Sequence, residues 1–202
     1  MKTAAIAGLG FRVHSGWAAA VAVAGPAKSP AVVLRRTIII ADPKLPGSKQ
    51  PYHAAERLGL QKAEALVKRC ADSTNALAHQ AVREIVAELD KMGWRAAGAC
   101  ILLSSGREVG SLEKILASHP MIHTAEGVFF REALRRASRK CGVPVTGIKE
   151  KEILAQAAGR FRLPAKALQR RASEMGKTLG PPWRQDEKLA ALAGWLVLSL
   201  KP

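Results

Sequence analysis

Residues 17–26 read Trp17-Ala18-Ala19-Ala20-Val21-Ala22-Val23-Ala24-Gly25-Pro26. An apolar run of this length, ended by glycine and proline, is typical of a buried strand. Apolar runs also lie at 4–7, where we expect Gly8-Leu9-Gly10 to end the strand, and at 31–41, which stops at Asp42-Pro43. Three strands at this spacing predict an antiparallel meander, and their small residues predict that helices pack closely over the sheet.

The rest of the chain alternates between helical and extended patterns. We expect a loop at 44–52, a helix at 60–92, a strand at 97–104, a helix at 120–140, a strand at 142–148, two short basic helices within 151–175, divided at Gly159 and Pro164, and a last helix at 185–198. A meander followed by such alternation predicts an α/β domain with a mixed sheet, in which parallel strands extend the meander and helices flank it. We expect one domain over 1–202, with 149–180 as a basic helical insertion before the last helix.

Composition excludes several classes of protein and favours one class of partner. The chain has 202 residues, 48% of them hydrophobic, and a formal net charge of +16. No apolar run reaches the roughly 18–20 residues of a membrane span, and the scattered Cys70, Cys100 and Cys141 fit neither a disulfide scaffold nor a zinc finger. These features predict a cytoplasmic protein with no membrane contact. The positive charge, concentrated in 131–177, predicts nucleic acid as partner.

Three motifs carry a family resemblance. Thr124-Ala125-Glu126-Gly127 opens a helix that runs into Cys141-Gly142-Val143-Pro144-Val145, Asp186-Glu187-Lys188-Leu189 begins an Ala/Leu-rich last helix, and Gly10–Trp17 has the character of a turn between the first two strands. With the order of the elements, these motifs resemble the ribonuclease H-like fold and, within it, the RuvC-type Holliday-junction resolvases. The resemblance implies two divalent cations, Mg or Mn, held by carboxylates of the first strand, the fourth strand and the last helix.

The acids that this resemblance requires are largely missing. The first-strand position falls at Gly8, and no acid lies anywhere in 1–41. The fourth-strand position falls near Leu103 or Ser104, in a stretch that also lacks acids, so that only Asp186 and Glu187 remain. Because glycine or a hydroxyl cannot replace an ionised ligand of hard cations, we expect a degenerate two-metal nuclease centre.

Polar residues near the expected end of the sheet are the site candidates. His123 and Glu126 share one helix face and suit an acid/base pair or metal ligands, or else a helix cap and a carboxylate favoured by the helix dipole. Glu126 also precedes Phe130 by four residues and should point inward. The candidates are, as catalytic residues, His14, His123, Glu126 and Asp186, of which Glu126 and Asp186 are also candidate metal ligands, and, as substrate-binding residues, Ser15, Ser104, Ser105, His119 and Arg184. His53 suits either a surface loop or a histidine cluster, and we expect the loop; we expect Trp183 to be a packing residue.

Clustered arginines are the candidates for binding phosphates. They are Arg131, Arg135, Arg139, Arg160, Arg162, Arg170 and Arg171. Aromatic residues do not interleave with them, so we expect contact with the DNA backbone and weak sequence specificity. The leading prediction is therefore a nucleic-acid-binding protein, for duplex or branched DNA, with a degenerate nuclease centre. A hydrolase or transferase using a His/Glu/Asp cleft, and a non-catalytic protein-interaction module, are the alternatives, and a homodimer is left open.

Overall fold

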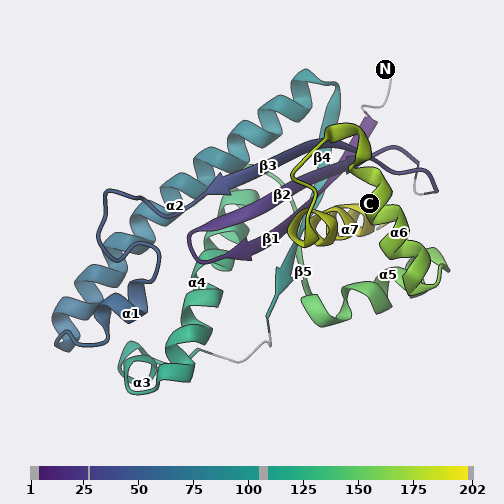
Figure 1. Ribbon diagram of the computed structural model, residues 1–202. Coiled ribbons are helices and arrows are strands. Elements are labelled where there is room, and N and C mark those ends of the chain that lie inside the picture. The colour runs from purple at the N-terminus through teal and green to yellow at the C-terminus, as the bar shows by residue number, and fades with distance from the viewer. Residues whose placement is uncertain (1–4, 27, 105–108, 200–202) are drawn as a thin grey trace.

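A five-stranded mixed sheet forms the centre of the computed structural model, which describes residues 5–26, 28–104 and 109–199 (Figure 1). The strands are β1 (Ala5–His14), β2 (Trp17–Ala24), β3 (Ala31–Ile39), β4 (Trp94–Leu103) and β5 (Val145–Lys149). Their order across the sheet is β3-β2-β1-β4-β5. The pairs β1–β2 and β2–β3 are antiparallel, while β1–β4 and β4–β5 are parallel. The predicted mixed sheet, a meander extended by parallel strands, is confirmed.

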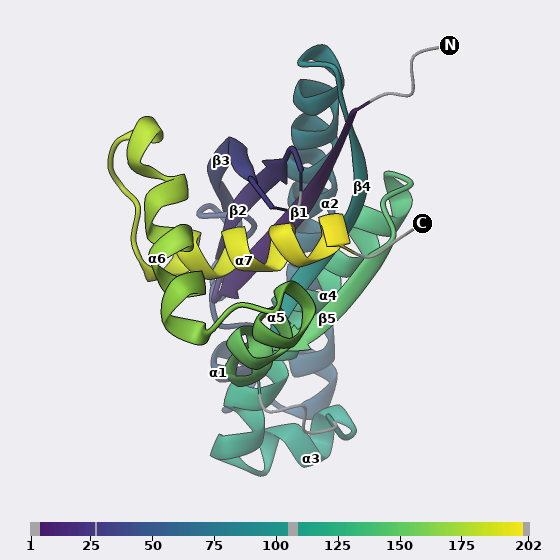
Figure 2. The same ribbon diagram turned by 90° about the vertical axis from the view of Figure 1, so that its right-hand side faces the viewer.

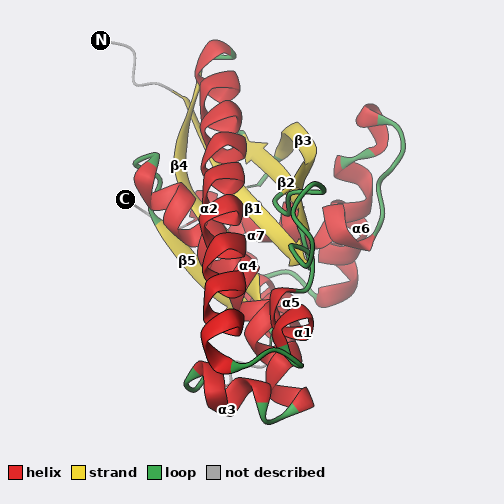
Figure 3. Cartoon of the chain, turned by 90° about the vertical axis from the view of Figure 1, so that its left-hand side faces the viewer, coloured by secondary structure: helices red, strands yellow, loops and turns green. Residues whose placement is uncertain are grey.

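Helices cover both faces of this sheet. They are α1 (Pro51–Ala55), α2 (Leu60–Lys91), α3 (Leu112–Leu116), α4 (His119–Lys140), α5 (Ile153–Phe161), α6 (Ala165–Met175) and α7 (Gln185–Ser199), with 3-10 turns at Glu150–Glu152 and Lys177–Leu179. Figure 3 shows α2 and α4 in front of one face, and Figure 2, from the opposite side, shows α5, α6 and α7 over the other. No described helix is long and apolar enough to cross a membrane.

The first strand is longer than the sequence suggests. The prediction that Gly8-Leu9-Gly10 ends the strand is wrong, because β1 continues through them to His14 and the turn is Ser15-Gly16. Ala7, Leu9, Phe11 and Val13 pack in one core with residues of α2 and α4. The alternating residues therefore face α7, which places Gly8, Gly10, Arg12 and His14 on that face.

The glycines of β1 let α7 approach the sheet closely. A Cβ atom on Gly10 would lie 1.8 Å from the carbonyl oxygen of Ala190, and one on Gly8 would lie 2.2 Å from that of Gly194. Ten residues of α7 are buried, and eight of them, including the fully buried Trp195, belong to a second hydrophobic core on this face of the sheet. The predicted close packing of a helix over small strand residues is confirmed, and it fixes the start of α7 against the end of β1.

Two short helices and one helix boundary differ from the prediction. The expected loop at 44–52 ends at Pro51, which begins α1, and α3 has no counterpart among the expected elements. His53 is a helical residue packed against α4, so its assignment to a surface loop is wrong. Gly159 does not divide the basic helices, because α5 runs through it and ends where Arg162 adopts a left-handed φ of 52° before Pro164.

Candidate functional site

The carboxyl ends of β1, β4 and β5 lie at the same edge of the sheet, since these three strands are parallel. Ligand-binding and catalytic groups gather at such edges in α/β folds. His14 ends β1, Ser104 follows β4, and Glu150 follows β5. The first residues of α7 meet this edge because the helix is seated on the glycines of β1.

Four side chains form an arginine–carboxylate cluster at this edge: Arg12, His14, Glu150 and Asp186. The Nε and NH2 groups of Arg12 donate hydrogen bonds to the two carboxylate oxygens of Glu150, at 3.0 and 2.8 Å. Its third nitrogen, NH1, donates to Oδ1 of Asp186. Nε2 of His14 lies 2.8 Å from the same Oδ1, and the His14 ring stacks on Trp17 with 4.3 Å between ring centroids. A single guanidinium thus links the ends of β1, β5 and α7.

The basic side chains of this cluster offset part of its negative charge. Hydrogen bonds to Glu150, and secondarily to Asp186, raise the pKa of Arg12 although partial burial lowers it. Burial raises the pKa of Asp186, but the hydrogen bonds and charges of His14 and Arg12 outweigh burial, so the net pKa lies below its ordinary value. Both interactions favour the charged forms. Asp186 is therefore an ionised carboxylate whose negative charge is compensated by protein groups.

A second group of polar side chains, the histidine cluster, consists of His53, His119, His123 and Glu126. Glu126 is only 3% exposed, which confirms the prediction that it points inward. Its Oε1 lies 3.0 Å from Nδ1 of His53 and accepts the backbone N–H of that residue at 3.2 Å. His123 contacts His119, with 3.1 Å between their Nε2 atoms. Glu126 therefore pairs with His53, and among the described residues no hydrogen bond or ion pair joins it to His123 or to Asp186.

The remaining candidates for substrate binding do not form a third group. Ser15 lies exposed in the β1–β2 turn, and Ser104 lies exposed just beyond β4. Arg184 is also exposed, and its backbone N–H donates to the buried Glu187. Ser105 lies outside the described residues. Trp183 packs against the second core and donates from Nε1 to the carbonyl oxygen of Ala172, which confirms its predicted packing role.

The candidate phosphate-binding arginines divide between internal contacts and solvent. Arg131 donates to the carbonyl oxygens of Leu102 and Gly127, and burial lowers its pKa. Arg135 pairs with Glu132, and Arg171 donates to the carbonyl oxygen of Lys28. Exposed arginines are Arg139 at the end of α4 and Arg160, Arg162 and Arg170 on and between α5 and α6. Of these, Arg160 also donates from Nε to Oγ of Ser199 at 3.0 Å. Arg139 thus belongs to the helical layer on the opposite face of the sheet from the other three.

The same topology occurs in solved structures of RuvC. The Thermus thermophilus RuvC in complex with a Holliday junction substrate superposes with a TM-score of 0.54 at 12% identity, over 94% of this chain and 90% of that one. The Thermus thermophilus RuvC structure gives a TM-score of 0.50 at 13% identity, over 93% and 90%. The fold is ribonuclease H-like. Neither a protein-family model nor a curated protein matches the sequence.

The residues at the edge of this ribonuclease H-like sheet do not fit a two-metal centre. A carboxylate cannot be accommodated at Gly8, because the backbone of α7 occupies the space of its Cβ atom. Ser104 offers only a hydroxyl at the end of β4. Asp186 and Glu150 are carboxylates, but a guanidinium already lies between them. Two divalent cations need several ionised oxygen ligands and no fixed cation among them, so the donor set and the charge are both unsuitable.

Arg12 and Glu150 are site residues that sequence reasoning missed. The geometry of the strands could have indicated both. Arg12 follows Gly10 by two residues and Gly8 by four, so it faces α7 as they do, and Glu150 directly follows a strand parallel to β1. The sequence pattern around His53 favours a loop over a place in a histidine cluster. Its approach to Glu126 depends on the contact between α1 and α4, which no local sequence pattern records.

Proposed function

We propose that this protein binds nucleic acid through the phosphate backbone and that its ribonuclease H-like sheet edge is held by an internal arginine instead of metal ions. The observation that carries the second part is the placement of the Arg12 guanidinium between Glu150 and Asp186. A fixed cation satisfies these carboxylates permanently, so the edge is a structural anchor rather than a hydrolytic centre.

The exposed arginines of the α5–α6 region are the proposed phosphate contacts. Arg160, Arg162 and Arg170 are exposed on the same side of the sheet as α7. A protein of this fold, RuvC, has been solved with a Holliday junction substrate, which supports duplex or branched DNA as the ligand class. Phe161, which lies between Arg160 and Arg162, stacks on Trp195 inside the protein, and guanidinium groups without a free aromatic platform favour backbone contact over the reading of base sequence.

Binding to DNA at several salt concentrations tests the proposal. We expect a four-way junction and an unrelated duplex to bind at low ionic strength, with the logarithm of the affinity falling linearly with the logarithm of the salt concentration. Mg²⁺ or Mn²⁺ should produce no cleavage of either DNA. Failure to retard any nucleic acid at low salt would refute DNA binding. Metal-dependent cleavage that disappears in Asp186→Asn would refute the proposed structural role of the sheet edge.

A matched pair of triple variants locates the DNA-binding surface. Replacing Arg160, Arg162 and Arg170 by glutamine should reduce the slope of the salt dependence by about 0.9 for each phosphate that these arginines neutralise. The control variant replaces three exposed cations at and near the start of α2, Arg57, Lys62 and Arg69, by glutamine. It therefore removes the same net charge from a different surface. Equal loss of affinity in both variants would show that only overall charge matters and that the α5–α6 assignment is wrong.

A further inference from the structure

Three imidazoles lie close together at α4, and none of them takes part in the arginine–carboxylate cluster. His119 and His123 are four residues apart in α4 and so lie on one face of that helix. His53 comes from α1 and packs against both, with ring centroids 5.2 Å from His119 and 4.7 Å from His123. One candidate donor nitrogen from each ring lies within 4.8 Å of the other two. Two separate helices thus bring three nitrogen donors to one point.

Two carboxylates lie behind these rings. Oε1 of Glu126 is 3.0 Å from Nδ1 of His53, and Oε1 of Glu56 is 3.6 Å from Nδ1 of His119. Histidines that bind metals commonly direct the second ring nitrogen to a carboxylate, which fixes the tautomer and the ring orientation. In this arrangement the Nε2 atoms of His53 and His119 are the nitrogens left for a ligand. The two Nε2 atoms of His119 and His123 already face each other at 3.1 Å.

The Nδ1 atom of His53 gives an independent indication. It is buried and has no hydrogen-bond partner, because its contact with Glu126 has the distance but not the angle of a hydrogen bond. A buried polar atom without a hydrogen-bond partner destabilises the folded state. A small rotation of the ring would align Nδ1–H with the carboxylate of Glu126. A ligand that fixes Nε2 would hold the ring in that orientation.

The spacing of the donors matches one class of ion. In a tetrahedral site with metal–nitrogen bonds of about 2.0–2.1 Å, neighbouring nitrogens are about 3.3 Å apart. The 3.1 Å between the Nε2 atoms of His119 and His123 is close to this value. The donor atoms of the three rings lie within 4.8 Å of one another, and rotation of the side chains can shorten the longer of these distances. Imidazole suits zinc, copper, nickel and iron, whereas Mg²⁺ and Ca²⁺ require oxygen ligands.

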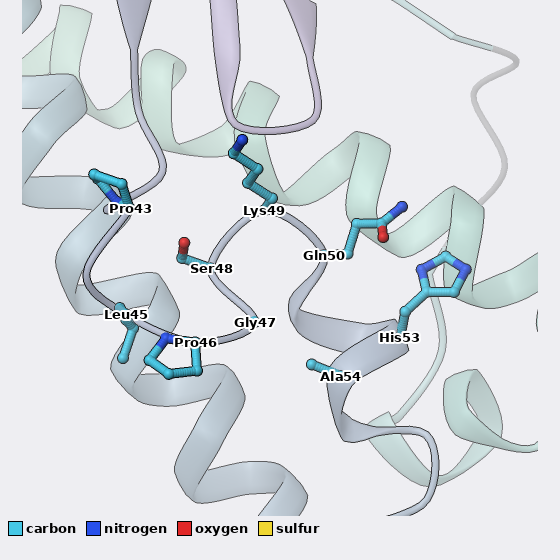
Figure 4. Close-up of a pocket in the computed structure, with 9 residues that line it drawn as sticks. All are labelled: Pro43, Leu45, Pro46, Gly47, Ser48, Lys49, Gln50, His53 and Ala54. Atoms are coloured by element: carbon cyan, nitrogen blue, oxygen red, sulfur yellow. The ribbon is translucent and has the colours of Figure 1, made fainter.

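We propose that His53, His119 and His123 bind one divalent transition-metal ion of the zinc class through their Nε2 atoms, with Glu126 and Glu56 orienting the rings. Three protein ligands leave one coordination position for water or an exogenous ligand. His53 also lines a hollow of about 530 Å³ formed by residues 43–54 (Figure 4). The ion would fasten α1, and the loop that precedes it, to the first turns of α4.

Binding of Zn²⁺ to the tag-free protein, measured by isothermal titration calorimetry, is the direct test. We expect saturable binding of one ion per chain. His119→Ala and His123→Ala change exposed residues, and each should weaken binding by more than the roughly 10–100-fold expected for loss of an outer carboxylate. Glu126→Gln should fall within that smaller range. His79→Ala, a histidine of α2 outside the cluster, is the control and should bind as the original chain does.

Cobalt and DNA binding complete the test. Substituted Co²⁺ should show the intense visible absorption of a tetrahedral nitrogen-coordinated ion, and His123→Ala should abolish that absorption. Absence of stoichiometric Zn²⁺ binding, or binding that persists in both His119→Ala and His123→Ala, would overturn the proposal. Because the cluster contacts neither α5 nor α6 among the described residues, salt-dependent DNA binding should not change in these variants. The metal site and the proposed function can therefore fail separately.

Discussion

The arginine–carboxylate cluster and the histidine cluster differ in where their charges lie. In the first, two carboxylates are brought together by strand ends and a helix start, and the Arg12 guanidinium compensates them. In the second, three imidazoles are brought together by two helices, and carboxylates lie behind them instead of a cation between them. In the first cluster the positive charge is therefore a side chain of the protein, whereas the second presents nitrogen donors that suit a bound metal ion.

This difference shows why a fold cannot be equated with an activity. At the edge where a ribonuclease H-like nuclease would place metals, the guanidinium of Arg12 already donates hydrogen bonds to two carboxylates. The metal-binding pattern lies instead on the first turns of α4, outside the set of strand ends. Variants that remove one side chain from either cluster, or the close contact that positions it, should separate the two kinds of site.

Gly10→Ala should disrupt the close contact between β1 and α7 that places Asp186 beside Arg12. The added Cβ would lie 1.8 Å from the backbone oxygen of Ala190, which belongs to α7 and has no flexible end to move away. Overpacking of a close backbone contact costs about 3 kcal/mol or more. We expect urea-induced unfolding to show a decrease of at least that size in the free energy of unfolding.

Gly159→Ala is the matched control for this change. Gly159 lies within α5, and a Cβ atom there would meet nothing within 4 Å. Alanine in a helix is favoured over glycine by about 0.8–1.0 kcal/mol, so the control should stabilise the protein slightly. A Gly10→Ala protein as stable as the control would show that α7 is not seated on β1 as described.

Arg12→Gln removes the counter-charge of the first cluster and should have the next largest effect. Glu150 and Asp186 would then share one site without a cation, at a cost of about 1–3 kcal/mol for this partly exposed cluster. Like-charged neighbours raise each other's pKa in the folded state, so the cost should shrink as the pH falls and the carboxylates take up protons. Urea unfolding at neutral and acidic pH measures both effects.

The control for Arg12 is an arginine that also has two acidic partners but whose side chain is 39% exposed, against 21% for Arg12. Arg36 pairs with Glu84, at 3.6 Å, and with Glu88 on the surface of α2. Surface pairs of this kind contribute about 0–1 kcal/mol, so Arg36→Gln should cost less than Arg12→Gln. Equal costs would indicate that the arginine–carboxylate cluster is an ordinary surface ion pair.

The sequence predicts most elements of the fold, but of each cluster it predicts an acid and misses a partner that the acid contacts. Runs such as 17–24 and the helix from Leu60 are recognisable because period and end signals agree. The sequence pattern ends β1 too early at Gly8, because a glycine is a turn signal locally and a close-packing position only when the partner helix is known. Asp186 stands out in the sequence as an acid at the start of the last helix, and Glu126 as an acid on the apolar side of its helix. Their partners Arg12 and His53 come from elements more than seventy residues away, and such pairing has no local signature.

Asp186→Asn probes the acid side of the first cluster and should have a smaller effect. The pKa of Asp186 in the folded protein lies below its ordinary value, so its ionised form stabilises the fold at pH values above about 4, the unfolded pKa. That contribution is lost as the pH falls through the lowered pKa. We expect Asp186→Asn to cost about 1 kcal/mol at neutral pH and progressively less below about pH 4, in unfolding curves recorded from neutral to acidic pH. A difference that grows with acidity would contradict this sign.

His123→Ala should have the smallest effect on the metal-free protein, and this contrast separates the two clusters. His123 is exposed and lies against the imidazoles of His53 and His119, so its removal without metal should change the free energy of unfolding by at most about 0.5 kcal/mol. Zn²⁺ at about a hundred times its dissociation constant should stabilise the original chain by about 2.7 kcal/mol through mass action. The variant should lose nearly all of that gain, whereas Asp186→Asn should keep it. Thermal unfolding with and without Zn²⁺ compares the three proteins directly, and a zinc-dependent gain that persists in His123→Ala but disappears in Asp186→Asn would place the metal at the sheet edge after all.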